Sequence, residues 1–127
     1  MDIAEMVSLD IDRGSALLDA LDRAKLKVGV ALWAHLAEYD DWRLVVSARQ
    51  FDSLDLRDAY GLLNDSLATA GFTPRTTPPI MILPIADPFI RELRRLFGKA
   101  KSVEGMRLGG QMIADRFVQD AYVYRIS

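Results

Sequence analysis

Alternating apolar and polar residues predict two hairpins in this chain. The alternating runs are residues 28–36 and 42–49 for the first hairpin, and 106–113 and 117–126 for the second. The polar segment 37–41 separates the first pair of runs, which is typical of antiparallel strands joined by a turn. Gly109-Gly110 indicates a bulge or a sharp bend in the second hairpin. Residues 80–83 are continuously apolar, as expected of a central strand that is buried on both faces.

Apolar residues at helical spacing predict three helices. They run from Asp10 or Asp12 to about Ala24, from about Leu56 to Ala70, and from about Pro88 to Phe97. Ser53 and Asp55 precede the second helix, and Asp87 stands where the side chain of an N-terminal cap is needed for the third. Gly71 and Gly98 follow the last turns, where glycine commonly ends a helix.

The order of elements is therefore α-β-β-α-β-α-β-β, which predicts a single α+β domain over residues 1–127. Residues 1–9 are expected to form a flexible N-terminal segment. The two hairpins require antiparallel pairing, so we expect a mixed or antiparallel sheet of about five strands with the helices mainly on one face. The residues predicted to form the core are Leu32, Trp42, Leu44, Leu63, Ile82, Leu83 and Leu93. Trp33 lies beside His35 on the less apolar side of its run and is the tryptophan expected at the surface.

Composition narrows the class of protein. The chain has no cysteine, which excludes disulfides, thiol catalysis and thiolate zinc sites and favours a reducing compartment. Its longest apolar stretches are too short to span a bilayer, and its first residues are acidic rather than basic, unlike a secretory signal. These features predict a soluble cytoplasmic protein that does not bind a membrane.

The formal net charge is −2, but the two parts of the chain differ in sign. Residues 1–70 hold seven basic and thirteen acidic residues, whereas residues 71–127 hold nine basic and five acidic ones. The basic residues that are candidates for binding nucleic acid are Arg91, Arg94, Arg95, Lys99 and Lys101. A basic helix face can lie along phosphates, but a solvated surface with no partner is the favoured interpretation.

His35 is the only histidine, and Glu38 and Asp41 follow it in the predicted turn. These three side chains are candidate ligands for one divalent cation, while acidic residues are also ordinary in solvated turns. Asp52, Asp55 and Asp58 recur at every third residue near the predicted start of a helix. A nuclease uses such carboxylates, but helix starts favour aspartate because their free amides attract anions.

Two segments carry a resemblance to known proteins. Residues 31–33 with 41–45, and the ending Asp-Ala-Tyr-Val-Tyr-Arg-Ile at 120–126, resemble an uncharacterised family of short bacterial proteins over about residues 10–126. The resemblance implies the same order of elements, and it implies no activity, cofactor or catalytic residue.

These observations rank three functions. A non-enzymatic binding or assembly module with no cofactor and an unidentified protein partner comes first, because titratable residues are not clustered. A nucleic-acid-associated accessory protein that uses the basic third helix comes second, and a metal-dependent phosphodiesterase or nuclease comes third. The run 121–126 is rich in β-forming residues and is expected at a sheet edge, so a homodimer through the C-terminal hairpin is also predicted.

Overall fold

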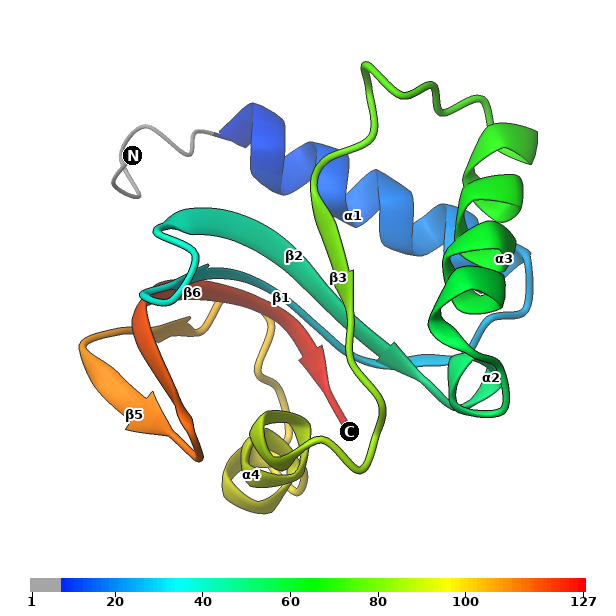
Figure 1. Ribbon diagram of the computed structural model, residues 1–127. Coiled ribbons are helices and arrows are strands. Elements are labelled where there is room, and N and C mark those ends of the chain that lie inside the picture. Colours follow the sequence, from blue (N-terminus) through cyan, green and yellow to red (C-terminus); the bar gives the residue numbers. More distant parts are fainter. Residues whose placement is uncertain (1–7) are drawn as a thin grey trace.

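The computed structural model describes residues 8–127, so most of the segment expected to be flexible lies outside the described residues. The described chain is a mixed α+β domain with four helices and one six-stranded sheet (Figure 1). The helices are α1 (Ser8–Arg23), α2 (Arg49–Asp52), α3 (Leu56–Thr69) and α4 (Pro88–Phe97). The strands are β1 (Val28–Leu36), β2 (Asp41–Ala48), β3 (Ile80–Ile82), β4 (Arg107–Leu108), β5 (Gln111–Ile113) and β6 (Arg116–Ile126).

Strand β1 lies at the centre of the sheet. It pairs antiparallel with β2 on one side and with β6 on the other, while β3 runs parallel to β2 at one edge. Strands β4 and β5 both pair antiparallel with β6, and Gly109-Gly110 interrupts them. Gly110 has a φ of 64°, in the left-handed region that favours glycine. Both predicted hairpins and the predicted bend are thereby confirmed.

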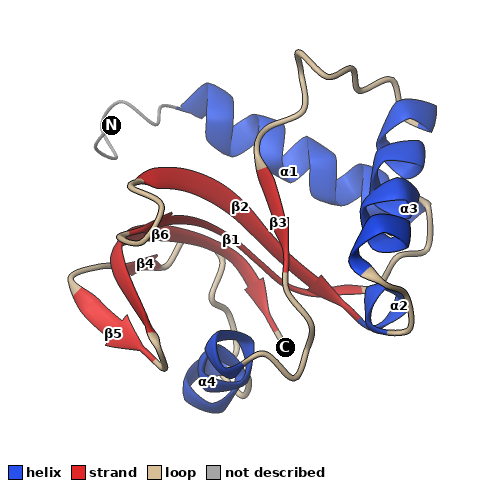
Figure 2. Cartoon of the chain, viewed as in Figure 1, coloured by secondary structure: helices blue, strands red, loops and turns tan. Residues whose placement is uncertain are grey.

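Each face of the sheet carries its own core. Helices α1, α2 and α3 cover one face, and α4 covers the other, as the ribbon and the cartoon show (Figures 1 and 2). Alternate residues of β1 serve the two faces, since Trp33 packs in the first core and Leu32 in the second. All the residues predicted to form the core are buried: Leu32, Trp42, Leu44, Leu63, Ile82, Leu83 and Leu93.

The prediction that Trp33 lies at the surface is wrong, because its side chain is 3% exposed. Residue spacing along β1 showed correctly that Trp33 faces away from Leu32. It does not indicate that α1 covers the face on which Trp33 lies. The indole Nε1 donates to the hydroxyl oxygen of Tyr124 over 3.1 Å, which satisfies its polar atom inside the core.

The predicted positions of two strands in the sheet are also wrong. Strand β3 is buried on both faces, as expected, but it is an edge strand rather than a central one. Conversely, the expected edge strand β6 is internal, because β1 covers one side and β4 and β5 cover the other. Both errors arise because the composition of a strand records how well its faces are buried, and not which strands lie beside it.

Helix boundaries agree with their capping residues. Asp55 accepts a hydrogen bond from the amide of Asp58 at 2.8 Å, and Asp87 accepts one from the amide of Phe89 at 2.9 Å. Two differences remain. The first helix begins at Ser8 rather than at Asp10 or Asp12, and the short helix α2 directly follows β2, where no helix was predicted.

Candidate functional site

A cavity of about 470 Å³ lies where β1 begins, β2 ends and α4 passes beneath them, and we call it the basic cavity. Its described lining residues are Lys27, Gly29, Val30, Ser47, Arg49, Gln50, Ile85, Arg94 and Ser127. Three of these side chains are cationic and none of the described ones is acidic. The volume falls within the range of ordinary small-molecule sites.

Strand ends and helices bring the three cations together from distant parts of the sequence. Lys27 precedes β1, Arg49 begins α2, and Arg94 lies in the last turns of α4. All three residues are exposed, and none forms an ion pair with another described residue. Arg94 donates its Nε to the backbone oxygen of Ser127 over 2.8 Å, which leaves its two terminal nitrogens without a described partner.

Two buried polar atoms in the same lining also have no partner among the described residues. Ser47 is 1% exposed, and its Oγ makes no hydrogen bond within residues 8–127. Gln50 donates its Nε2 to the carbonyl oxygen of Lys25 at 3.0 Å, while its buried Oε1 accepts from no described group. Buried polar atoms are nearly always hydrogen-bonded, so these two atoms are available to a water molecule or to a ligand.

A second depression, the α4 hollow, adjoins the basic cavity. It measures about 400 Å³ and its described lining is Arg91, Arg94, Arg95, Gly98, Lys99 and Ser127. Because Arg94 and Ser127 line both, the two form one continuous basic surface. Arg95 is partly neutralised, since it hydrogen-bonds Glu92 and that bond holds the pKa of the Glu92 carboxyl below its usual range. Lys101 is exposed and lies outside the described lining of both.

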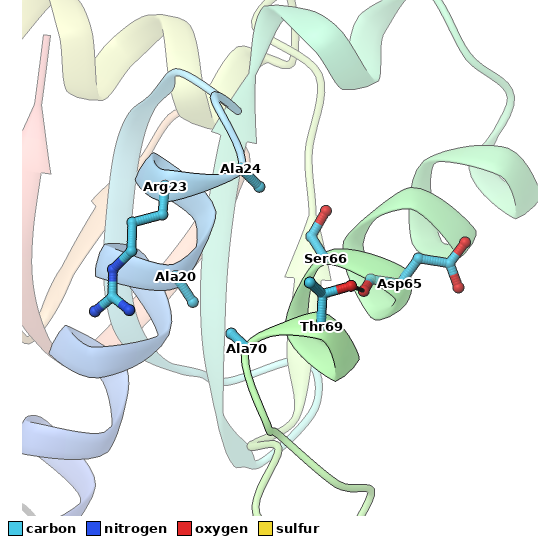
Figure 3. A pocket seen from close by; sticks show the side chains of 7 residues that line it. All are labelled: Ala20, Arg23, Ala24, Asp65, Ser66, Thr69 and Ala70. Carbon is cyan, nitrogen blue, oxygen red and sulfur yellow. Dashed lines mark hydrogen bonds between the residues drawn. The ribbon is translucent and has the colours of Figure 1, made fainter.

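The groove between α1 and α3 provides a contrast (Figure 3). It measures about 380 Å³, and alanines together with Ser66 and Thr69 form much of its lining. Both hydroxyls are already used, because Ser66 donates to the Leu62 carbonyl and Thr69 donates to the Asp65 carbonyl. The charged ends of Arg23 and Asp65 extend away from each other in Figure 3. This groove therefore holds no orphaned polar atom of the kind that marks the basic cavity.

The three candidate metal ligands do not converge, and Nε2 of His35 makes no hydrogen bond to any described residue. His35 is only partly exposed, and its Nε2 lies 3.5 Å from Oδ1 of Asp40. Glu38 pairs with Arg116, while Oδ1 of Asp41 accepts a hydrogen bond from the amide of Trp42 at 2.7 Å. Within residues 8–127, no group of three or more histidine, cysteine or acidic side chains is arranged to hold a metal ion.

The aspartates near the start of α3 serve the backbone. Asp55 caps α3, and Asp52 accepts hydrogen bonds from the amide of Ile85 at 3.3 and 3.4 Å. The capping role favoured for this group is confirmed for Asp55.

Comparisons with known proteins give no relative. No protein-family model, curated protein or solved structure matches the chain, so the resemblance to a family of short bacterial proteins stays a prediction. Among the described residues, no helix is both long and apolar enough to cross a membrane.

Sequence reasoning found part of this site. Arg91, Arg94, Arg95 and Lys99 were candidates and do lie together, but Lys27, Ser47, Arg49 and Gln50 were not singled out. One signal was present for Ser47, which is a polar residue between the apolar residues Val46 and Ala48 in a predicted strand. A hydroxyl group in such a place needs either a partner or a ligand.

Proposed function

We propose that this protein is a non-enzymatic binding module that takes an anionic ligand in the basic cavity. The observation that carries the proposal is the convergence of Lys27, Arg49 and Arg94 on one cavity without an acidic residue in its described lining. Guanidinium groups in this arrangement supply charge and directed donors, which are the means by which proteins hold phosphate and carboxylate groups. The lining thus supplies the groups that hold an anion in place.

Convergence of like charges has a cost that a ligand removes. The three side chains carry like charges, which repel one another, and the described lining holds no acidic side chain to compensate them. An anion at the mouth of the cavity replaces this repulsion with attraction, and each hydrogen bond to a charged group contributes about 1.5–3 kcal/mol. This supports binding of an anion whose charge is concentrated, such as a phosphate.

A nucleic-acid partner is the second candidate, because the basic surface continues onto the α4 hollow. Two observations make it weaker. Arg95 is already paired with Glu92, and both tryptophans are buried, so neither can stack on a base. We therefore favour a small anion over a nucleic-acid backbone.

The test compares two kinds of anion. Calorimetry with inorganic pyrophosphate should show binding to the natural protein, and the double variant Arg49→Gln, Arg94→Gln should weaken it at least about tenfold. Arg75→Gln is the control, because Arg75 is exposed and lies outside the described lining of both depressions. Absence of pyrophosphate binding at millimolar concentration contradicts the proposal.

A labelled single strand and a labelled duplex of DNA form the second arm. Affinity for DNA that falls steeply between about 50 and 200 mM salt, and that is lost when Arg91, Arg94 and Arg95 are replaced by glutamate, would support the nucleic-acid alternative instead. We expect at most weak binding of either DNA.

We also propose assembly as a homodimer through the C-terminal hairpin, now with β5 rather than β6 at the interface. The supporting observation is an exposed apolar pair on that edge. Met112 and Phe117 lie opposite each other in the β5–β6 ladder and are 60% and 41% exposed. An unpaired strand edge with apolar side chains is a template for pairing with a second copy.

A further inference from the structure

The residues that line the basic cavity differ in charge and exposure, and we call the exposed cationic side its mouth and the side with buried Ser47 its floor. The three cationic residues that line it are exposed, whereas Ser47 is 1% exposed and carries a hydroxyl without a described partner. A ligand that satisfies both ends must itself have two ends, of which one is anionic and the other is polar but uncharged.

The hydrogen-bonding needs of the floor define the uncharged end. Gln50 uses its amide nitrogen on the Lys25 carbonyl, which fixes the orientation of the amide and leaves Oε1 as an acceptor. An acceptor requires a donor from the ligand, and the hydroxyl of Ser47 can either give or receive a hydrogen bond. A hydroxyl group on the ligand is able to serve both.

The remaining lining is compatible with the carbon frame of such a ligand. Val30 and Ile85 contribute apolar wall, and the volume of about 470 Å³ exceeds what a bare phosphate ion fills. We infer that the basic cavity binds a phosphate monoester of a hydroxyl-bearing compound of the sugar-phosphate class. Its phosphate lies at the cationic mouth, and its hydroxyls lie against Ser47 and Gln50. This inference rests on the proposed binding of an anion and adds the class of ligand.

The experiment uses calorimetry with four probes: inorganic phosphate, glycerol 3-phosphate, ribose 5-phosphate and ribose. At least one of the two monoesters should bind at least about tenfold more tightly than inorganic phosphate, since it adds hydrogen bonds and apolar contact. Ribose without phosphate should bind more weakly than ribose 5-phosphate.

The variant Ser47→Ala distinguishes the contribution of the floor to ligand binding from that of the cationic mouth. It should weaken the tighter monoester about three- to tenfold and leave inorganic phosphate unchanged, because the phosphate does not reach the floor. Its melting temperature should not fall, since the hydroxyl it removes has no described partner. Ser66→Ala is the matched control, because that hydroxyl donates to its own helix outside the basic cavity.

The possible outcomes are distinct. If inorganic phosphate and pyrophosphate both fail to bind, the proposed function itself is wrong. If they bind but neither monoester binds more tightly, or if Ser47→Ala leaves monoester binding unchanged, only the ligand class is wrong. In that case water is the partner of the orphaned atoms on the floor.

Discussion

The hydroxyl group of Tyr124 makes two hydrogen bonds where the sheet contacts α1. It accepts from Nε1 of Trp33 at 3.1 Å and donates to the carbonyl oxygen of Ile11 at 2.6 Å. These two hydrogen bonds connect Trp33 and Tyr124 of the sheet to Ile11 in α1, which is 113 positions from Tyr124 in the sequence. Burial raises the pKa of Tyr124 well above its usual range, because the charged phenolate would lose its hydration.

The variant Tyr124→Phe should therefore change both stability and its pH dependence. Near neutral pH we expect a loss of about 1–3 kcal/mol in the free energy of unfolding, because the indole nitrogen is left buried without a partner. A raised pKa in the folded state stabilises the natural protein fully below the ordinary tyrosine pKa of about 10, and this contribution is lost as the pH rises toward the folded value. Urea unfolding at a series of pH values measures both effects.

The difference in the free energy of unfolding between the natural protein and Tyr124→Phe isolates the contribution of Tyr124. It should be constant up to about pH 9 and then shrink by about 1.4 kcal/mol by about pH 11, since only the natural protein carries this phenol. A difference that is independent of pH over that range contradicts the assignment of the buried hydroxyl.

At the scale of elements, α1 packs closely on the sheet at Gly14. A Cβ atom built there would lie 2.8 Å from Cζ of Tyr124, a distance that real Cβ atoms essentially never show, and 3.0 Å from Nε1 of Trp33, which is tighter than most real contacts. Glycine weakens a helix interior, and here it allows the helix to lie over the Trp33–Tyr124 hydrogen bond. Gly61 in α3 is the opposite case, because an added Cβ would meet nothing within 4 Å.

The pair gives a matched prediction about helix packing. Gly14→Ala should destabilise the protein by about 1–3 kcal/mol through overpacking, even though alanine favours the helix itself. Gly61→Ala should stabilise it by about 0.5–1 kcal/mol, because only the helical preference changes. Chemical denaturation of both variants is the measurement. A stabilised Gly14→Ala would show that α1 does not pack this closely.

The local sequence pattern predicted the helices and strands well. It failed where the position or burial of an element depends on which other segment packs against it. The bounds of α4 and β1 follow from apolar spacing and capping residues, which are properties of the nearby sequence. The internal position of β6 and the burial of Trp33 depend on segments far away along the chain. Nothing within either run of residues records those neighbours.

The candidate site also combines residues that local sequence indicates with residues that only the tertiary structure brings together. The arginines of α4 were found because they cluster in one helix, whereas Lys27, Ser47 and Arg49 join them only through the folding of β1 against β2. Charge convergence of this kind is a property of tertiary structure. Its residues come from the start of β1, the end of β2, the start of α2 and the last turns of α4.

For the whole molecule, the two sheet edges are unequal. At the β3 edge, the amide of Ile82 donates to the hydroxyl oxygen of Tyr60 at 2.9 Å, so a side chain already occupies an outward-facing backbone group. The β5 edge carries exposed Met112, and within Gln111–Ile113 it contains neither a charge nor a proline. Native proteins commonly blunt edges with such features, and β5 has neither.

We therefore expect two copies to pair through β5. In the β5–β6 ladder, Met112 lies opposite Phe117, in the middle of the edge strand. Met112→Lys places a charge on this edge and should convert the dimer to a folded monomer. Leu56→Lys is the matched control, because Leu56 is 63% exposed on α3 and should leave the dimer intact. Sedimentation velocity at tens of micromolar distinguishes the two states, and a monomeric natural protein at that concentration rules out the dimer.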